Sequence, residues 1–196
     1  MSDLPTQDVQ SDHAKQIHAE AIEVADETDN RTVLAFIETP KGSRNKYEYD
    51  KERGALRLDR VLFSSVHYPA DYGFIPDTHW DDGDPIDILV LMNEPSFPGC
   101  LIDARPVGGL DMRDEKGDDF KVVAVPTHDP RYNNIQGISD LASHILKEIA
   151  NFFETYKILE EKETQIMGWH DVDETLKRIA RSRELYRELQ ATTATT

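Results

Sequence analysis

Cysteine is almost absent from this sequence. Its 196 residues contain only Cys100, so no disulfide can form within the chain. A single thiol is typical of proteins that fold around a hydrophobic core in a reducing compartment. The sequence also lacks any apolar run of about 18 residues, the length that a membrane-spanning helix requires, and residues 1–30 lack the basic start and apolar stretch of a secretion signal. These absences predict a cytoplasmic protein with neither a membrane span nor a signal peptide.

Several motifs of common enzyme classes are missing too. There is no GxxxxGK[ST], GxGxxG, GxSxG or HExxH, which argues against P-loop enzymes, dinucleotide-binding enzymes, serine hydrolases and zinc peptidases. No cysteine pair accompanies the histidines, so zinc-ligand spacing is absent. A calcium-binding loop around Gly83 would require glutamate where Leu89 stands. The class left open is metal chemistry with oxygen ligands.

Basic residues are scarce relative to acidic ones. Lysine and arginine total 22 against 38 aspartates and glutamates, which gives a formal net charge of −16. Such a chain repels nucleic acid and anionic membranes, so we expect neither as a partner. Residues 1–30 carry eight of the acids and one base, Lys15, and therefore −7 of the total. We expect residues 1–30 to form an acidic extension, flexible or with a short helix, and residues 31–196 to form a single domain.

Residues 31–130 have the texture of a β structure. Short runs rich in β-branched and aromatic residues alternate there with Gly, Pro and Asp clusters, and no helical pattern separates them. Without crossover helices a parallel sheet is disfavoured, so we predict a mainly β (α+β) fold with a small antiparallel barrel. The predicted strands are residues 33–37, 46–49, 56–63, 86–92, 99–107 and 120–125.

Two helices are predicted after the barrel. Apolar residues recur at three- and four-residue intervals from Leu141 to Leu159, behind Ser139 or Asp140 as the cap, which indicates an amphipathic helix over 139–163. A second helix over 171–190 begins at Asp171, with Glu174 in the position of a capping box. We expect the apolar faces of both helices to pack on the barrel.

The most informative stretch is an acidic turn before a buried strand. Asp81, Asp82, Asp84 and Asp87 lie within seven residues, beside Gly83 and Pro85. Carboxylates this close repel one another unless a cation stabilises their ionised forms, and a hard divalent ion is the natural counter-charge. Taken alone, the turn is equally compatible with a solvated acidic loop.

A second acidic group and several cations suggest what the turn could serve. Asp111, Asp114, Glu115, Asp118 and Asp119 surround a predicted hairpin tip, and Lys121 lies on the same sheet face as Asp119. Each feature alone is ordinary for a surface. A cavity with carboxylates on one wall and cations and tyrosine on another suits an anion that arrives with metal ions, such as a polyphosphate. The candidates for that second wall are Lys46, Arg60, Lys121, Tyr156 and Lys157.

These residues carry a family resemblance. The segment Asp82-Gly83-Asp84-Pro85-Ile86-Asp87 resembles the aspartate signature of the soluble family I inorganic pyrophosphatases. Further matches follow in the family's order over roughly residues 32–170, whereas the acidic extension and the final helix lie outside the resemblance. The matching segments are Glu38 before Pro40, Lys46 to Lys51, Asp59-Arg60, Tyr68 to Gly73, Arg105 to Gly108, Asp114 to Lys121, Val123 to Pro126 and Phe152 to Lys157.

The resemblance implies a five-stranded OB-like barrel that hydrolyses pyrophosphate to two phosphates with several magnesium ions, for which Mn²⁺ could substitute. It implies a homo-oligomer, commonly a hexamer in prokaryotes. Carried over by position, the metal ligands would be Asp82, Asp84, Asp87, Asp114 and Asp119, with Glu38 acting through bound water. Lys46, Arg60, Lys121, Tyr156 and Lys157 would hold the phosphates, and Glu48, Tyr68 and Tyr72 would orient the site. Asp84 would be the base that takes a proton from the attacking water.

Two other functions remain open from the residues alone. Asp82-Gly83-Asp84 also satisfies the DxD metal motif of nucleotide-sugar transferases, although the helix-poor body offers no nucleotide-binding α/β domain. Alternatively, the acids could bind a divalent ion that only rigidifies the barrel. That alternative leaves the conjunction of Lys, Arg and Tyr residues unexplained.

Overall fold

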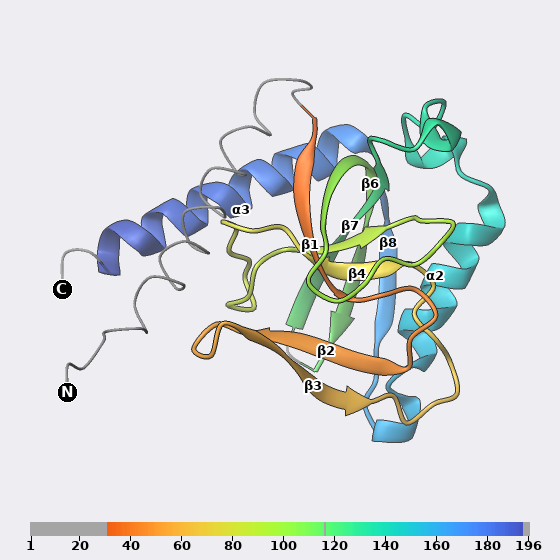
Figure 1. Ribbon diagram of the computed structural model, residues 1–196, viewed down its shortest axis with the longest axis horizontal. Coiled ribbons are helices and arrows are strands. Elements are labelled where there is room, and N and C mark those ends of the chain that lie inside the picture. Colours follow the sequence, from red (N-terminus) through yellow and green to blue (C-terminus); the bar gives the residue numbers. More distant parts are fainter. Residues whose placement is uncertain (1–30, 116, 194–196) are drawn as a thin grey trace, which may run out of the picture.

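The structure is a computed structural model that describes residues 31–115 and 117–193. The acidic extension expected over residues 1–30 lies outside the described residues. Figure 1 shows a β barrel with α2 along one side, α3 across another, and the β2–β3 hairpin standing apart from the other strands. No helix in the described part of the chain is long and apolar enough to span a membrane.

Five strands close into a ring, in the order β1, β4, β5, β7, β6 and back to β1. This confirms the prediction of a five-stranded barrel. The pairing of β5 with β7 is parallel, whereas an antiparallel barrel was expected. A closed ring with an odd number of strands cannot alternate direction at every step, so one parallel pair is unavoidable. The strands are β1 Val33–Thr39, β4 Asp71–Phe74, β5 Asp87–Val90, β6 Leu101–Asp114 and β7 Gly117–Pro126.

Two strands were not expected from the sequence. β4 is only four residues long. β8, Gln165–His170, pairs with β6 along the edge of β6 that does not pair with β7. Both are too short to show a clear apolar alternation, and their partners are distant in the chain. β6 therefore pairs with β1, β7 and β8 along its length.

β2, Asn45–Asp50, and β3, Ala55–Val61, form a hairpin outside the ring. Hydrogen bonds tie it to β1, because the Tyr49 amide donates to Glu38 Oε1 at 2.7 Å and the Tyr47 amide donates to Thr39 Oγ1 at 3.0 Å. The Tyr49 ring also packs edge-on against Phe36 of β1. The hairpin thus forms a second wall above one end of the barrel.

The first predicted helix is shorter than expected. α2 spans Ser143–Thr155, and the rest of residues 139–163 holds only two short 3₁₀ turns, at Ile138–Asp140 and Ile158–Glu160 (η2 and η3), and non-helical residues. Asp140 does not cap α2, because its Oδ2 accepts the amides of Gln136 and Gly137 instead. A further 3₁₀ turn, η1, spans Pro130–Tyr132.

The second helix was predicted well. α3 spans Val172–Thr193, and Asp171 caps it by accepting the Glu174 amide at 3.0 Å. The capping box is not completed by the Glu174 side chain, which bonds Arg178 instead.

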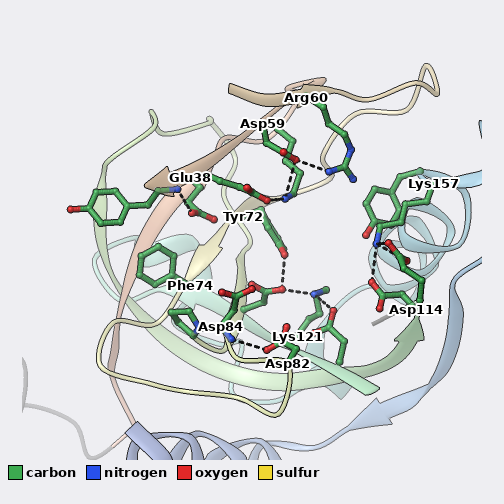
Figure 2. A pocket seen from close by; sticks show the side chains of 18 of the residues that line it. Glu38, Asp59, Arg60, Tyr72, Phe74, Asp82, Asp84, Asp114, Lys121 and Lys157 are labelled. Carbon is green, nitrogen blue, oxygen red and sulfur yellow. Dashed lines mark hydrogen bonds and ion pairs between the residues drawn. The ribbon is translucent and has the colours of Figure 1, made fainter. Parts of the chain in front are cut away.

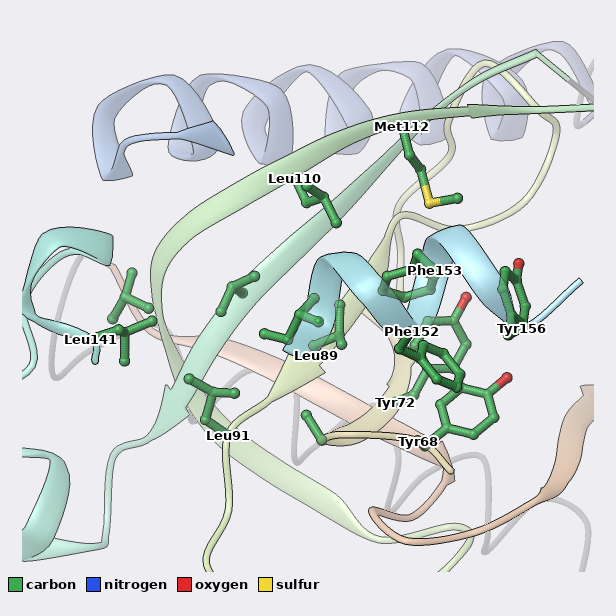
Figure 3. Packing of buried hydrophobic residues seen from close by; sticks show 14 of the residues in the cluster. Tyr68, Tyr72, Leu89, Leu91, Leu110, Met112, Leu141, Phe152, Phe153 and Tyr156 are labelled. Carbon is green, nitrogen blue, oxygen red and sulfur yellow. The ribbon is translucent and has the colours of Figure 1, made fainter. Parts of the chain in front are cut away.

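The two faces of the barrel strands form two apolar clusters. Ile88 and Val90 of β5 point to one face, where they pack with residues of β7 and of β1. Because β1 pairs with neither β5 nor β7, it faces them across the ring, and these side chains fill the interior of the barrel. Leu89 and Leu91 point outward, toward Phe152 and Phe153 of α2 (Figure 3). Asp87 and Leu89 lie on the same face of β5. The packing of Leu89 in the outward cluster therefore sets the direction in which Asp87 points.

Candidate active site

A cavity of about 420 Å³ opens between the hairpin, the end of the barrel and the chain that follows α2. Figure 2 shows carboxylates, lysines and an arginine turned toward a common space. The barrel and hairpin thus bring together residues from seven separate segments. The lining residues are Glu38, Lys46, Glu48, Tyr49, Lys51, Asp59, Arg60, Tyr72, Phe74, Asp82, Asp84, Pro85, Asp87, Asp114, Glu115, Gly117, Asp118, Asp119, Lys121, Tyr156, Lys157 and Lys162.

The acidic turn before β5 provides one wall. Gly83 has φ +92°, a left-handed conformation that glycine adopts without strain, and the turn is closed by the Trp80 amide donating to the Asp84 carbonyl at 2.8 Å. Asp82 Oδ1 accepts the Asp84 amide at 3.1 Å. Burial raises the pKa of Asp82, with the neighbouring acids adding to the effect. The Asp84 side chain lines the same cavity.

Lys121 lies at the centre of the site, buried to 3% exposure. It bonds Asp87, its partner in the parallel register of β5 and β7, and it bonds Asp119 at 2.6 Å. The Tyr72 hydroxyl donates to the same Asp87 oxygen at 2.6 Å. Burial opposes the charge of Lys121, but Asp87 and Asp119 outweigh it and hold the pKa of Lys121 well above its usual value. Burial also raises the pKa of Asp119, although Lys121 lowers it in part.

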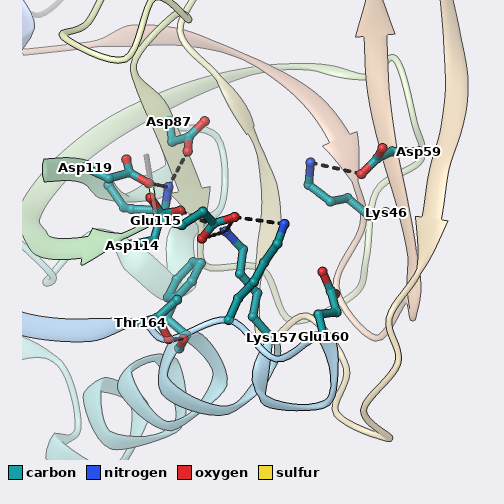
Figure 4. Close-up of polar contacts among 12 residues, drawn as sticks. Lys46, Asp59, Asp87, Asp114, Glu115, Asp119, Lys157, Glu160 and Thr164 are labelled. Atoms are coloured by element: carbon teal, nitrogen blue, oxygen red, sulfur yellow. Dashed lines mark hydrogen bonds and ion pairs between the residues drawn. The ribbon is translucent and has the colours of Figure 1, made fainter. Parts of the chain in front are cut away.

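Lys157 forms a second cationic centre after the end of α2 (Figure 4). Its Nζ lies 2.8 Å from Asp114 Oδ2 and 3.1 Å from Glu115 Oε2, and Lys162 reaches the same Glu115 at 2.9 Å. Burial by itself would raise the pKa of Glu115, but the hydrogen bonds from Lys162 and Lys157 outweigh burial and lower this pKa to about 2. The hairpin tip between β6 and β7 is therefore tied to the chain beyond α2.

The hairpin supplies the remaining cations. Lys46 of β2 bonds Glu48 and lies 3.5 Å from Asp59, and Arg60 of β3 bonds Asp59 at 2.6 Å. Burial raises the pKa of Asp59 in part, but Lys46 and Arg60 outweigh it and leave the pKa below its usual value. Asp59 thus holds Lys46 and Arg60 on the cavity side.

Glu38 is a carboxyl group of the site with a strongly raised pKa. Burial raises its pKa to about 7, and the nearby acids Asp87 and Glu48 add to the effect, while the Tyr49 amide and Lys46 oppose it. A carboxyl group with such a pKa can exchange protons near neutral pH.

The chain matches known proteins over most of its length. A family model described as "Pyrophosphatase: Inorganic pyrophosphatase" matches residues 35–187. The chain belongs to the inorganic pyrophosphatase family. The match extends well into α3, beyond the limit of the resemblance seen in the sequence.

Individual relatives agree with the family match. The inorganic pyrophosphatase of Methanosarcina mazei is 53% identical over 161 residues, which cover 82% of this chain and 95% of the relative. That of Halobacterium salinarum is 52% identical over 157 residues, covering 80% and 89%. Among solved structures, the inorganic pyrophosphatase from Thermus thermophilus superposes with a TM-score of 0.80 at 44% identity, covering 82% of this chain and 94% of that one.

The cavity contains every site residue expected from the sequence except one. Tyr68 does not line it; the ring is 2% exposed and packs against Tyr72 and Phe152 in the outward cluster. Tyr68 therefore supports the wall of the cavity that Tyr72 lines. Sequence reasoning overlooked Asp59 as a site residue, although it directly precedes Arg60, and it overlooked Lys162, for which no local signal exists because only the fold after η3 brings it to Glu115.

The carboxylates are not gathered into a closed metal cage. Over the described ranges, no group of three or more His, Cys, Asp and Glu side chains encloses a common point suited to an ion. Lys121 and Lys157 occupy the space between the acids and neutralise them. The donor set is nevertheless composed of carboxylate oxygens, and burial disfavours the ionised forms of Asp82 and Asp119, so the site fits hard divalent cations.

Proposed function

We propose that this chain hydrolyses inorganic pyrophosphate to two phosphates in a reaction that depends on magnesium. The observation that carries the proposal is the composition of this one cavity, in which carboxylates from the acidic turn and the β6–β7 tip face cations from the hairpin and from Lys121 and Lys157. Membership of the inorganic pyrophosphatase family supports the same reaction. The family match also argues against a nucleotide-sugar transferase.

Five aspartates would hold the ions: Asp82, Asp84, Asp87, Asp114 and Asp119. Several Mg²⁺ ions, or Mn²⁺ in their place, would neutralise the phosphate oxygens and make the attacking water more acidic. The aspartates project from two sides of one cavity, which allows more than one ion. Glu38 contributes a carboxyl group that can act through bound water.

The phosphate groups would be held by Lys46, Arg60, Lys121, Tyr156 and Lys157. Each of these lysines and the arginine already pairs with a carboxylate in the structure, so a phosphate oxygen and a metal ion could together replace those pairs without leaving unpaired charge. Glu48 and Tyr72 orient Lys46 and Asp87, with which they form hydrogen bonds. Tyr68 supports Tyr72 from behind.

Asp84 is assigned as the general base. Its side chain lines the cavity, in the same turn as Asp82. It would take the proton from the attacking water as the bond from oxygen to phosphorus forms. The phosphate leaving group would depart toward the cations of the opposite wall.

The test is phosphate release from pyrophosphate with and without Mg²⁺, for wild type and for Asp84→Asn. We expect release by the wild type only with the ion, and a loss of about two to four orders of magnitude in kcat for the variant, because the amide cannot take a proton. Glu94→Gln, a change of an exposed acid outside the cavity, serves as the control and should turn over like wild type.

The outcomes separate the possibilities. Normal turnover by a folded Asp84→Asn variant would remove Asp84 from the role of base. Binding of Mg²⁺ and pyrophosphate by the wild type without any turnover would instead indicate a non-catalytic ion binder.

We also propose that the chain works in the cytoplasm as a homo-oligomer, with a hexamer favoured. Exposed apolar side chains support an assembly: Phe63 is 61% exposed after β3 and Leu159 is 63% exposed in η3. The ion pair of Arg60 with Glu160 brings these segments together. Light scattering coupled to size exclusion should give about six times the chain mass of 22.4 kDa. A monomer mass at micromolar concentration would contradict the hexamer.

A further inference from the structure

A second hollow, of about 440 Å³, lies behind the active-site cavity, against α3. Asp118 and Asp119 line both spaces, so β7 separates them. Four basic residues and five acidic ones line the second hollow, which therefore has no excess positive charge that would recruit an anion. The residues that line it instead connect α3 to two groups of active-site acids, the Asp82–Asp84 turn and Asp119.

Arg181 of α3 supports the acidic turn. Its Nη2 lies 3.3 Å from Asp81 Oδ1, and its guanidinium carbon lies 5.7 Å from the centre of the Trp80 ring. The His79 amide donates to the Ser182 carbonyl at 2.9 Å. Three successive residues of the turn, directly before Asp82, thus contact one turn of α3.

The acidic turn would transmit a shift of Trp80 to its carboxylates. The Trp80 amide bonds the Asp84 carbonyl at 2.8 Å, and the Gly83 amide bonds the Trp80 carbonyl at 3.0 Å. At its base, buried Thr78 closes the loop by accepting the Ile86 amide at 3.0 Å. Asp82 and Asp84 therefore belong to a compact loop whose outer side is fixed by α3.

Arg178, one turn earlier on α3, contacts the part of β7 that carries Asp119. Its guanidinium stacks over the Phe120 ring at 4.5 Å and bonds Asp111 with two nitrogens. Gly109 also lies close to that ring, since a Cβ there would lie 2.1 Å from Phe120 Cζ. Phe120 follows Asp119 directly in β7, so fixing the ring fixes the backbone that carries Asp119.

The two supports meet. The Trp80 and Phe120 rings pack against each other with centroids 6.1 Å apart. We propose that Arg178 and Arg181 are positioning residues: by stacking on Phe120 and Trp80, they set the distance between Asp119 and the Asp82–Asp84 turn at which the two groups bind the same metal ions. The inference deepens the proposed function and rests on it.

Electrostatics makes the test specific. Removing a cation near a group of carboxylates should by itself strengthen the binding of Mg²⁺, because repulsion of the incoming ion falls. A positioning role predicts the opposite, because displaced carboxylates bind an ion less well. The direction of the change in affinity therefore distinguishes the two effects.

The experiment measures Mg²⁺ binding by calorimetry, without substrate, for wild type, Arg181→Gln, Arg178→Lys and Lys177→Gln. Arg181 is 60% exposed, so its substitution should leave the fold intact, and Arg178→Lys keeps the charge but loses the planar stacking group. We expect the apparent Kd for Mg²⁺ to rise about tenfold in both arginine variants. Lys177 is 75% exposed, lines the same hollow and stacks on neither ring, so Lys177→Gln should bind Mg²⁺ as tightly as wild type or more tightly.

Circular dichroism confirms folding, and KM for pyrophosphate at saturating Mg²⁺ should stay within about twofold of wild type, since the phosphate-binding cations are untouched. Wild-type Mg²⁺ affinity in a folded Arg181→Gln variant would overturn the proposal, whatever the behaviour of Arg178→Lys. Equal weakening in Lys177→Gln would also overturn it. Absence of phosphate release by the wild type would refute the proposed function separately, because the binding measurement does not depend on turnover.

Discussion

At the scale of single residues, the carboxyl groups around the cavity differ chiefly in the cations that reach them. Asp87 and Asp119 share Lys121, and Asp114 and Glu115 share Lys157. Among the described residues, Glu38 accepts the backbone amide of Tyr49, and Lys46 acts on it without forming an ion pair. Burial therefore raises the pKa of Glu38 to about 7.

This shift predicts a pH dependence of stability. Between pH 4.5, the ordinary pKa of the group, and about 7, the folded state holds a proton on Glu38 that the unfolded state has lost. The free energy of unfolding should therefore fall as pH rises through this window, by about 2 to 3 kcal/mol from this group.

Glu38→Gln should remove that contribution, because an amide does not ionise while its oxygen can still accept the Tyr49 amide. As pH rises from 4.5 to 8, we expect the difference in the free energy of unfolding, variant minus wild type, to increase by about 2 to 3 kcal/mol. Urea unfolding with EDTA present measures it. An equal pH dependence in both proteins would show that Glu38 ionises normally in the folded state.

At the scale of elements, the β2–β3 hairpin depends on few contacts for its orientation. It lies outside the ring, and on the side facing η3 it is held by the ion pair of Arg60 Nε with Glu160 Oε1 at 3.0 Å. Glu160 is nearly buried, with 8% side-chain exposure, and so presents a fixed partner. Arg60 is thereby held over the cavity between Asp59 and Glu160.

Glu160→Gln should loosen this element without altering the metal ligands. We expect KM for pyrophosphate to rise about three- to tenfold at saturating Mg²⁺, with kcat changed less than about twofold, because Arg60 loses its orientation for ground-state binding. Glu161→Gln, the adjacent substitution at an exposed position, is the matched control. A lower KM in Glu160→Gln would show that Glu160 competes with phosphate for Arg60 instead of orienting it.

At the scale of the whole molecule, acidic groups outnumber basic ones, and the active site concentrates acids from separate segments. An ion that binds only the folded arrangement stabilises it by mass action, by about 2.7 kcal/mol at one hundred times its Kd. We therefore predict that Mg²⁺ at that concentration raises Tm by about 5 °C over protein treated with EDTA.

Scanning calorimetry checks this, with NaCl at matched ionic strength as the control for general screening of the net charge. The salt should give a clearly smaller shift. Equal shifts in Mg²⁺ and NaCl would mean that screening, and not a specific site, stabilises the protein.

The sequence by itself determined the five-stranded barrel, the approximate place of its strands other than β4, the place of α3, and the main charged residues of the cavity. Such features are local: strand runs alternate with Gly, Pro and Asp punctuation, Asp171 caps α3, and the acids crowd within one turn. Their likeness to one family added the ordered matches that no single motif could provide. Sequence spacing does not reveal which of two neighbouring tyrosines faces the cavity: Tyr72 lines it, whereas Tyr68 is buried behind it.

Only the tertiary structure decided how these pieces meet. It made β5 and β7 parallel and so placed Asp87 opposite Lys121, brought Lys162 to Glu115, ended α2 at Thr155, and set Arg178 and Arg181 beneath Phe120 and Trp80. The physical reason is that closing a ring and packing a helix on it join residues far apart in the chain, whereas propensity, capping and turn chemistry act over only a few neighbouring residues.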